Sequence, residues 1–270
     1  MEIRKQTFTI IAFLTFLFIS LHSCKKDGAS AVSLPVVQAY LYGGQAITVK
    51  LYQQKSLTDT AKYGSPIIGQ QLSISDGSNT ISLSETAKGV YTYADTTFLA
   101  AGKTYTLSFQ YLGKTVSAQT VMPQKTQQFA TQHSTVNYVY GSAPDIKPDT
   151  LNKFTWDNPD SLGHVIVFNN LDGNNFPLAG RGGFGQQSNA FEYDTEGKSV
   201  FYVVSNSFPY YGNYQVTLLS ANKEYIDLLK SNTIGANSQN LLNTPTNVVN
   251  GIGIFTALQA DTLSFIVYNR

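Results

Sequence analysis

The chain has 270 residues, of which 18 are basic and 17 acidic, so its formal net charge at pH 7 is +1. A chain this close to neutral has no electrostatic case for nucleic-acid binding, and we expect no nucleic-acid partner. The 17 tyrosines and 16 phenylalanines favour a β protein with an aromatic core. Cys24 is the single cysteine and excludes a disulfide within the chain, so the fold depends on its hydrophobic core.

Residues 1–23 are predicted to be a signal peptide. Arg4 and Lys5 give a positive head, and the segment 8–21 is apolar except for two threonines and one serine. This segment is shorter than the roughly 20 residues that span a bilayer, and it fits the h-region of an export signal. An A-x-A cleavage site is missing, and Leu21-His22-Ser23-Cys24 stands in its place.

Leu21-His22-Ser23-Cys24 resembles the bacterial lipobox. The resemblance implies that Cys24 is lipidated on sulfur and becomes the N-terminus after cleavage. Two or three acyl chains anchor a protein stably, because each buried CH₂ contributes about 0.8 kcal/mol. The alternative, a buried structural thiol, does not fit a cysteine followed directly by Lys25 and Lys26. Cleavage would remove two of the 18 basic and one of the 17 acidic residues, leaving 16 of each.

The segment 24–33 is predicted to be a polar tether and the segment 34–124 a β-sandwich. Apolar and polar residues alternate in ITVKLYQ (47–53) and again in KTYTLSFQYLGKTVSAQTV (103–121). The sequence QLSISDGSNTISLSE (71–85) shows the same alternation on both sides of Asp76 to Asn79. This pattern predicts a hairpin with its turn at Asp76 to Asn79. About seven short strands in roughly 90 residues indicate an immunoglobulin- or fibronectin-like sandwich.

The sequence QKTQQFATQHST (124–135) is expected to connect the sandwich to a second domain. This second domain is predicted for residues 135–270. Its expected strands are NKFTW (152–156), HVIVFNN (164–170), SVFYVVSN (199–206), NYQVTLLS (213–220) and TLSFIVYN (262–269). Asn222 is expected to cap one helix, on which Tyr225, Ile226 and Leu229 share a face. The predicted fold class is therefore mainly β, with an N-terminal immunoglobulin/fibronectin-like β-sandwich followed by a second mostly-β domain with one short helix.

Two histidines of the mature chain and one glycine-rich segment are weak candidates for ligand sites. His133 and His164 have no His or Cys at metal-ligand spacing, so we expect no zinc site and no cofactor. The sequence AGRGGFGQQS (179–188) lacks the Gly-Lys-Ser/Thr end of a phosphate-binding loop. We interpret it as a flexible loop on which Arg181 and Phe184 could touch a partner.

Two segments rich in aspartate and asparagine could supply oxygen ligands to calcium. They are WDNPDSLG (156–163), with Asp157, Asn158 and Asp160, and NLDGNN (170–175). The same residue types also build tight turns, because their side chains bond to nearby backbone and proline presets φ. We favour the turn interpretation for both segments.

The sequence SFPYYGNY (207–214) is the main candidate binding surface. One short segment is not expected to bury all four of its aromatic residues, which are Phe208, Tyr210, Tyr211 and Tyr214. Exposed tyrosines combine an apolar face with a polar tip and suit protein and sugar partners. The alternative is that two of them pack inward while the others cover a loop.

Glu192, Asp194 and Glu196 are candidate paired carboxylates for glycoside hydrolysis. On a strand they would share one face, because side chains alternate with period two. A solvated strand face is the favoured interpretation, and no G-x-S-x-G motif occurs. We therefore expect no catalytic residues and no enzymatic activity.

Four blocks of the mature chain, taken in order, resemble one protein family. They are LPVVQAYLYGGQAITVKL (34–51) with GVYTYADTTFLAAGKTYTLSFQYLGKTVSAQTVMP (89–123), then WDNP (156–159), YQVTLLSANKEYIDLLKS (214–231) and PTNVVNGIGIFTA (245–257). The family comprises Bacteroidota outer-membrane lipoproteins of unknown function, domain of unknown function 4249. The resemblance implies no assigned activity, but it implies a nutrient-uptake or accessory role beside TonB-dependent outer-membrane receptors.

The last of these blocks has a structural interpretation. Pro245, Gly251 and Gly253 are expected to shape a loop that feeds a strand at 254–256, with Asn247 in the same loop. Substitution of either glycine is therefore predicted to destabilise the fold.

The expected function is a non-catalytic outer-membrane lipoprotein that binds a partner protein, and the expected partner is a TonB-dependent receptor. The alternative is a glycan- or small-ligand-binding lipoprotein that uses the aromatic segment 207–214, and a glycosidase-type enzyme ranks last. The sequence after Cys24 lacks a long acidic run, so a surface-facing and a periplasm-facing position both stay open.

Overall fold

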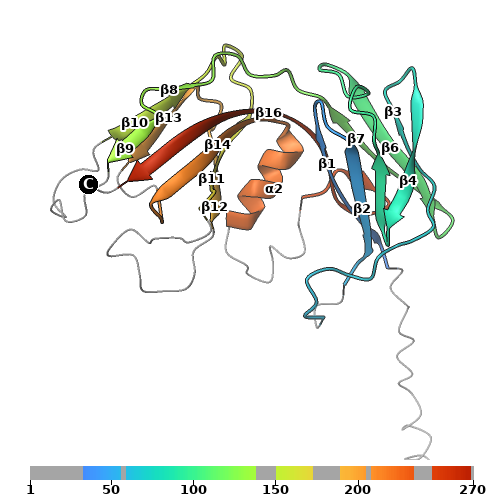
Figure 1. Cartoon of the computed structure of the whole chain (residues 1–270). Coiled ribbons are helices and arrows are strands. Elements are labelled where there is room, and N and C mark those ends of the chain that lie inside the picture. The colour runs from blue at the N-terminus through green and yellow to red at the C-terminus, as the bar shows by residue number, and fades with distance from the viewer. Residues whose placement is uncertain are drawn as a thin grey trace, which may run out of the picture. The chain divides into compact units, whose positions relative to one another are not determined.

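The computed structural model describes residues 33–55, 59–137, 150–172, 189–204, 208–233 and 245–268. The predicted signal peptide, Cys24, and the glycine-rich loop with Arg181 and Phe184 lie outside these residues. The described residues form strands β1 to β16 and the α-helix α2, so the fold is mainly β with one short helix (Figure 1). None of the helical segments among these residues has the length and apolar character needed to cross a membrane.

The N-terminal sandwich has seven strands, which are β1 (Pro35–Tyr42), β2 (Ile47–Gln53), β3 (Leu72–Ser75), β4 (Thr80–Ala87), β5 (Val90–Tyr93), β6 (Thr104–Tyr111) and β7 (Lys114–Val121). One sheet pairs β1 with β2 and β2 with β5, and the other pairs β3 with β6 and β6 with β7. β4 pairs with β3 through its first half and with β5 through its second half, so it passes from one sheet to the other. The predicted immunoglobulin/fibronectin-like sandwich is confirmed.

Alternating burial along these strands explains the sandwich core. Every second residue of β1 and β2 is buried, and Val37, Val49 and Leu51 pack in one cluster with Leu107 and Val116 from the opposite sheet. Because strand side chains alternate between faces, the intervening residues of β1 point away from this core.

The predicted hairpin turn after β3 is confirmed. The Asp76 carboxylate accepts hydrogen bonds from the backbone amides of Ser78 (2.9 Å) and Asn79 (2.7 Å). Lys103 donates to the same carboxylate at 2.6 Å. The Lys103 bond first, and then the two amides, hold the pKa of Asp76 well below its usual range.

Tyr105 fixes the corner between β5 and β6. Its ring is fully buried at the start of β6. Its hydroxyl accepts a hydrogen bond from the Ala100 amide (2.7 Å) and donates one to the Phe98 carbonyl (3.0 Å). A tyrosine near the start of the sixth strand that bonds back to the preceding connection is a hallmark of immunoglobulin-like sandwiches. This corner was not predicted from the sequence.

We expect Tyr105→Phe to lower the free energy of unfolding by about 1–3 kcal/mol, because two backbone groups at a part-buried corner lose their partner. Urea unfolding of the purified protein measures the change. Tyr111→Phe is the matched control, since it removes a hydroxyl that makes no hydrogen bond within the described part of the chain. Equal unfolding midpoints for the two variants would contradict the role of the corner.

The second region contains β8 (Ala130–Thr131), β9 (Thr135–Asn137), β10 (Thr150–Thr155), β11 (His164–Asn170), β12 (Ala190–Asp194), β13 (Val200–Val204), β14 (Gly212–Ala221), α2 (Lys223–Thr233), β15 (Val248–Val249) and β16 (Ile252–Tyr268). Four strands follow one another in the order β12-β11-β14-β16, and β13-β10-β8 form a separate sheet. The strands predicted at 152–156, 164–170, 199–206 and 213–220 and the predicted helix are confirmed. β8 lies in the segment expected to be a connection.

β16 is a single strand of 17 residues, whereas the sequence predicted two strands, at 254–256 and 262–269. Its first part pairs in parallel with β1 up to Leu258, and from Leu258 onward it pairs with β14. Residues 259–261, which lie between the two predicted strands, are paired with 218–220 of β14 and continue the ladder. β16 therefore joins β1 and β14 in one continuous sheet.

A polar cluster around the buried Thr120 of β7 connects the start of α2 to the sandwich. The Thr120 hydroxyl donates to the Glu224 carboxylate (2.6 Å) and accepts from the Ala257 amide (3.0 Å) and from the Asn222 side chain (3.0 Å). The helix begins directly after Asn222, as predicted. The Asn222 side-chain amide also donates to the Val121 carbonyl (2.6 Å), so this side chain secures the helix to β7.

Candidate functional site

The helix α2 packs on one face of the sheet β12-β11-β14-β16 (Figure 1). Ile226 and Leu229 are buried with Val165 of β11, Leu219 of β14 and Leu258 of β16. Tyr225 is half-buried beside them, so the three residues predicted to share a helix face do so. Glu224 in the first turn and Lys230 in the last turn also complement the helix dipole.

A pocket of about 240 Å³ lies between α2 and the sheet. It is lined by Tyr40 and Tyr42 from β1, Glu192 from β12, and Tyr225, Leu228 and Leu229 from α2. Three strands separate β1 from β12 in the sheet order, which in a flat sheet would place them roughly 19 Å apart. The sheet therefore curves around α2, and Tyr225 reaches side chains from both strands.

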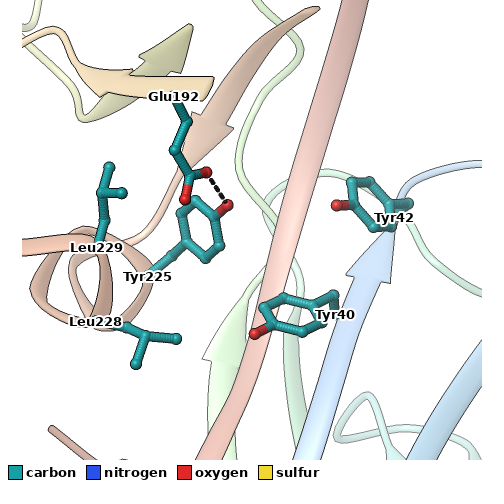
Figure 2. A pocket seen from close by; sticks show the side chains of 6 residues that line it. All are labelled: Tyr40, Tyr42, Glu192, Tyr225, Leu228 and Leu229. Carbon is teal, nitrogen blue, oxygen red and sulfur yellow. Dashed lines mark hydrogen bonds between the residues drawn. The ribbon is translucent and has the colours of Figure 1, made fainter. Parts of the chain in front are cut away.

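Tyr225 is the central side chain of the pocket (Figure 2). Its hydroxyl donates a hydrogen bond to the Glu192 carboxylate at 2.9 Å. Its ring meets the ring of Tyr40 edge to face, with centroids 6.0 Å apart and an interplanar angle of 88°. These contacts fix the ring and the carboxylate in relation to each other.

Burial and the negative charge of Glu192 keep the tyrosines of the pocket protonated. Burial is the main cause that raises the pKa of Tyr225, and the Glu192 charge raises it further. The pKa values of Tyr40 and Tyr42 are also raised, again chiefly by burial and in part by Glu192. At neutral pH the three hydroxyls are therefore neutral, and Glu192 is the charged group of the lining.

The three acids predicted to share a strand face do not do so. β12 ends at Asp194, and Glu196 lies in the following turn with φ of 55°. Asp194 forms an ion pair with Lys230 of α2 at 3.0 Å, and Glu196 pairs with Lys198 at 2.7 Å. Of the three, Glu192 alone lines the pocket.

The aromatic segment 207–214 was expected to be exposed, and for most of it this is wrong. Phe208, Tyr210 and Tyr214 are 2%, 8% and 1% exposed, and Tyr211 is half-buried. β14 begins at Gly212, so its alternation turns Tyr214 into the core, while Phe208 stacks on Phe265 at 5.6 Å. None of the four residues lines the pocket.

His164 belongs to a buried polar cluster. Its Nδ1 lies 3.0 Å from the Leu162 carbonyl, which accepts the ring proton, so Nε2 accepts from the Thr126 hydroxyl at 2.9 Å. The Ser220 hydroxyl is 2.7 Å from Thr126. Burial lowers the pKa of His164. Every polar atom of this cluster is used within the core, so we assign it a structural role.

The remaining candidates have turn or surface positions. The Asn158 side chain accepts from the Leu162 amide (2.9 Å) and donates to the carbonyls of Leu162 and Gly197 (both 3.0 Å), which confirms the turn interpretation of 156–163. Asp172 accepts from the backbone (2.9 Å) and the side chain (3.0 Å) of Asn213. His133 is exposed. Over the described ranges, no three His, Cys, Asp or Glu residues are grouped so that they could hold a metal ion.

The sequence matches a family model described as a domain of unknown function, DUF4249, over residues 29–264. The chain belongs to the DUF4249 family. The match spans all four sequence blocks from which the resemblance was inferred. None of the curated proteins matches this DUF4249 sequence.

Solved structures share only a distant likeness with this DUF4249 chain. The FN1–FN3 domains of chicken CNTN1 are 10% identical with a TM-score of 0.27, covering 87% of this chain and 64% of that one. A two-domain fibronectin type-III segment of chicken tenascin is 12% identical with a TM-score of 0.21, covering 69% of this chain and 90% of that one. Because these TM-scores are low, the sandwich assignment rests on the strand order and the corner of Tyr105.

Proposed function

We propose that this DUF4249 protein is a lipid-anchored, non-catalytic binding protein of the outer membrane. The observation that carries the proposal is the segment 1–24, a positive head and a short apolar run closed by Leu21-His22-Ser23-Cys24. The second of the two compact units of the chain begins at Leu34. About ten residues separate Cys24 from this unit, and the end-to-end distance expected for a chain of that length is roughly 18 Å, so we expect the folded unit to lie close to the membrane surface.

The proposed partner is a TonB-dependent receptor or another component of a nutrient-uptake system. Support for this partner comes from the family resemblance. A mature chain with 16 basic and 16 acidic residues would bind its partner through apolar and polar contacts rather than through steering by net charge.

Crosslinking in native membranes, followed by mass spectrometry of the attached proteins, tests this partner. We expect a TonB-dependent receptor to be recovered with the wild-type protein and to be lost when the lipid signal is replaced by one that releases the chain into the periplasm. A second lipoprotein of the same membrane is the control for chance proximity. If the receptor is no more abundant with the wild-type chain than with that control, the accessory role is refuted.

The second candidate function is small-ligand binding, and the pocket beside α2 favours it. Three tyrosine rings, two leucines and one carboxylate surround a space of about 240 Å³. Apolar walls with a few placed polar groups are the usual composition of a ligand site. The site differs from the segment 207–214 that the sequence pointed to.

A further inference from the structure

We propose that the pocket beside α2 binds a small organic cation, an alkylammonium group held between the tyrosine rings and Glu192. This inference deepens the second candidate function and rests on it. The argument uses the charge, the ring geometry and the size of the pocket.

The charge of the lining favours a cation. Glu192 is its only ionisable group besides the tyrosines, and the lining contains no lysine, arginine or histidine. Of the two lysines of α2, Lys230 forms an ion pair with Asp194 at 3.0 Å and Lys223 forms one with Asp227. The lining therefore carries one negative charge. An anionic ligand would be repelled by this charge and a cation attracted to it. Glu192 is exposed, so its charge stays hydrated when the pocket is empty.

The tyrosine rings provide two walls at a right angle. The interplanar angle of 88° between Tyr40 and Tyr225 makes a corner rather than a flat platform. A cation near the face of an aromatic ring is attracted by the ring quadrupole, by about 0.5–2 kcal/mol per ring. A sugar, in contrast, stacks on one open ring face. The corner thus fits a compact ammonium group better than a pyranose ring.

The Tyr225 hydroxyl holds the carboxylate in place. It donates to Oε2 of Glu192 at 2.9 Å, so it occupies one acceptor position and leaves the others for a ligand. Leu228 and Leu229 supply apolar surface for the methyl or methylene groups of the ligand. At about 240 Å³ the pocket is smaller than the roughly 300–1,000 Å³ typical of drug-sized ligands, so the cation must be small.

Calorimetric titration of the purified lipoprotein in a non-ionic detergent tests the proposal. Choline probes a quaternary ammonium, and ethylamine probes a primary ammonium of the kind a lysine side chain carries. The matched neutral probe is 3,3-dimethylbutan-1-ol, which has the shape of choline without its charge. We expect at least one of the two cations to bind at least about 10-fold more tightly than the neutral probe.

Glu192→Gln tests the carboxylate directly. Its amide oxygen still accepts the Tyr225 hydrogen bond, but the charge is gone, so we expect cation binding about 10-fold weaker at an unchanged melting temperature. Glu196→Gln removes the same charge from an exposed turn and is expected to leave binding unchanged. Tyr42→Leu removes the third tyrosine ring of the lining without touching the Tyr225–Glu192 bond, and should also weaken cation binding.

Three results would overturn the proposal. Affinities of both choline and ethylamine no higher than that of 3,3-dimethylbutan-1-ol would reject the cation and leave an apolar ligand site. Binding of a neutral monosaccharide without binding of either cation would favour the glycan alternative. If none of the probes binds at concentrations up to about 10 mM, the proposed small-ligand function is wrong. The receptor partnership is judged separately by crosslinking, so its failure is distinguishable from these results.

Discussion

Gly253→Ala is expected to lower the free energy of unfolding by about 3 kcal/mol or more. Gly253 has φ of 109°, a conformation that side-chain-bearing residues rarely adopt. A Cβ atom there would lie 2.0 Å from the carbonyl oxygen of Val37 on the neighbouring strand β1. Alanine must therefore change the local backbone or separate β1 from β16, and the parallel pairing of these strands would be lost.

Gly44→Ala is the matched control for this experiment. Gly44 also has a positive φ, 77°, but nothing lies within 4 Å of the position where its Cβ would be built. Substitution of Gly44 should lower the free energy of unfolding by only about 1–2 kcal/mol, the cost of a side chain at a positive φ. Urea unfolding of both variants separates the cost of the positive φ from the cost of the contact between the new Cβ and Val37. A cost at Gly253 no larger than that at Gly44 would contradict the close approach of β16 to β1.

Cys24→Ser is expected to abolish acylation of the protein. The acyl chains are attached through sulfur, and the serine oxygen does not replace it. One acyl chain gives only marginal membrane binding and two give stable anchoring, so the variant should also lose its retention in washed membranes. Metabolic labelling with an alkyne fatty acid measures the effect, and we expect the signal to fall to background.

Ser23→Ala is the control for the lipobox, because it keeps a small residue before the cysteine. This variant should be labelled like the wild type. Labelling that persists in Cys24→Ser would show that the fatty acid is attached elsewhere or is not covalently bound. The lipid-anchor part of the proposed function would then be wrong.

The strands of the sandwich were predictable because their core depends on local alternation. In β1, β2 and β6 every second residue is buried, and this period can be seen within seven or eight residues. The helix was equally predictable, since Ile226 and Leu229 repeat at helical spacing. The continuity of β16 was not, because residues 259–261 acquire their pairing from β14, about 40 residues earlier in the chain.

The pocket was only partly visible in the sequence. Glu192 was singled out as an acid and Tyr225 as part of an apolar helix face, but nothing connected the two. Alternation places Tyr40 and Tyr42 on one face of β1. What covers that face depends on the parallel pairing of β1 with β16 and on the position of α2, about 180 residues away.

The prediction that most of the aromatic segment 207–214 is exposed was wrong because it considered only the local sequence. Composition suggested that the four aromatic residues could not all be buried, and this treated the segment as a separate loop; three of them, Phe208, Tyr210 and Tyr214, are buried. In the structure Phe208 meets rings from distant strands, including Phe168 at 5.4 Å and Phe265 at 5.6 Å. A core built from several strands can bury more aromatic residues of one segment than the sequence of that segment indicates.

The proposed function depends first on a covalent lipid at the N-terminus of the mature chain. Mass spectrometry of the N-terminal peptide of the protein purified from its native membrane measures this directly. We predict a peptide that begins at Cys24 and carries the mass of a diacylglyceryl group, with or without a third acyl chain. A chain that still contains residues 1–23, or a Cys24 that bears a free thiol, would contradict the account.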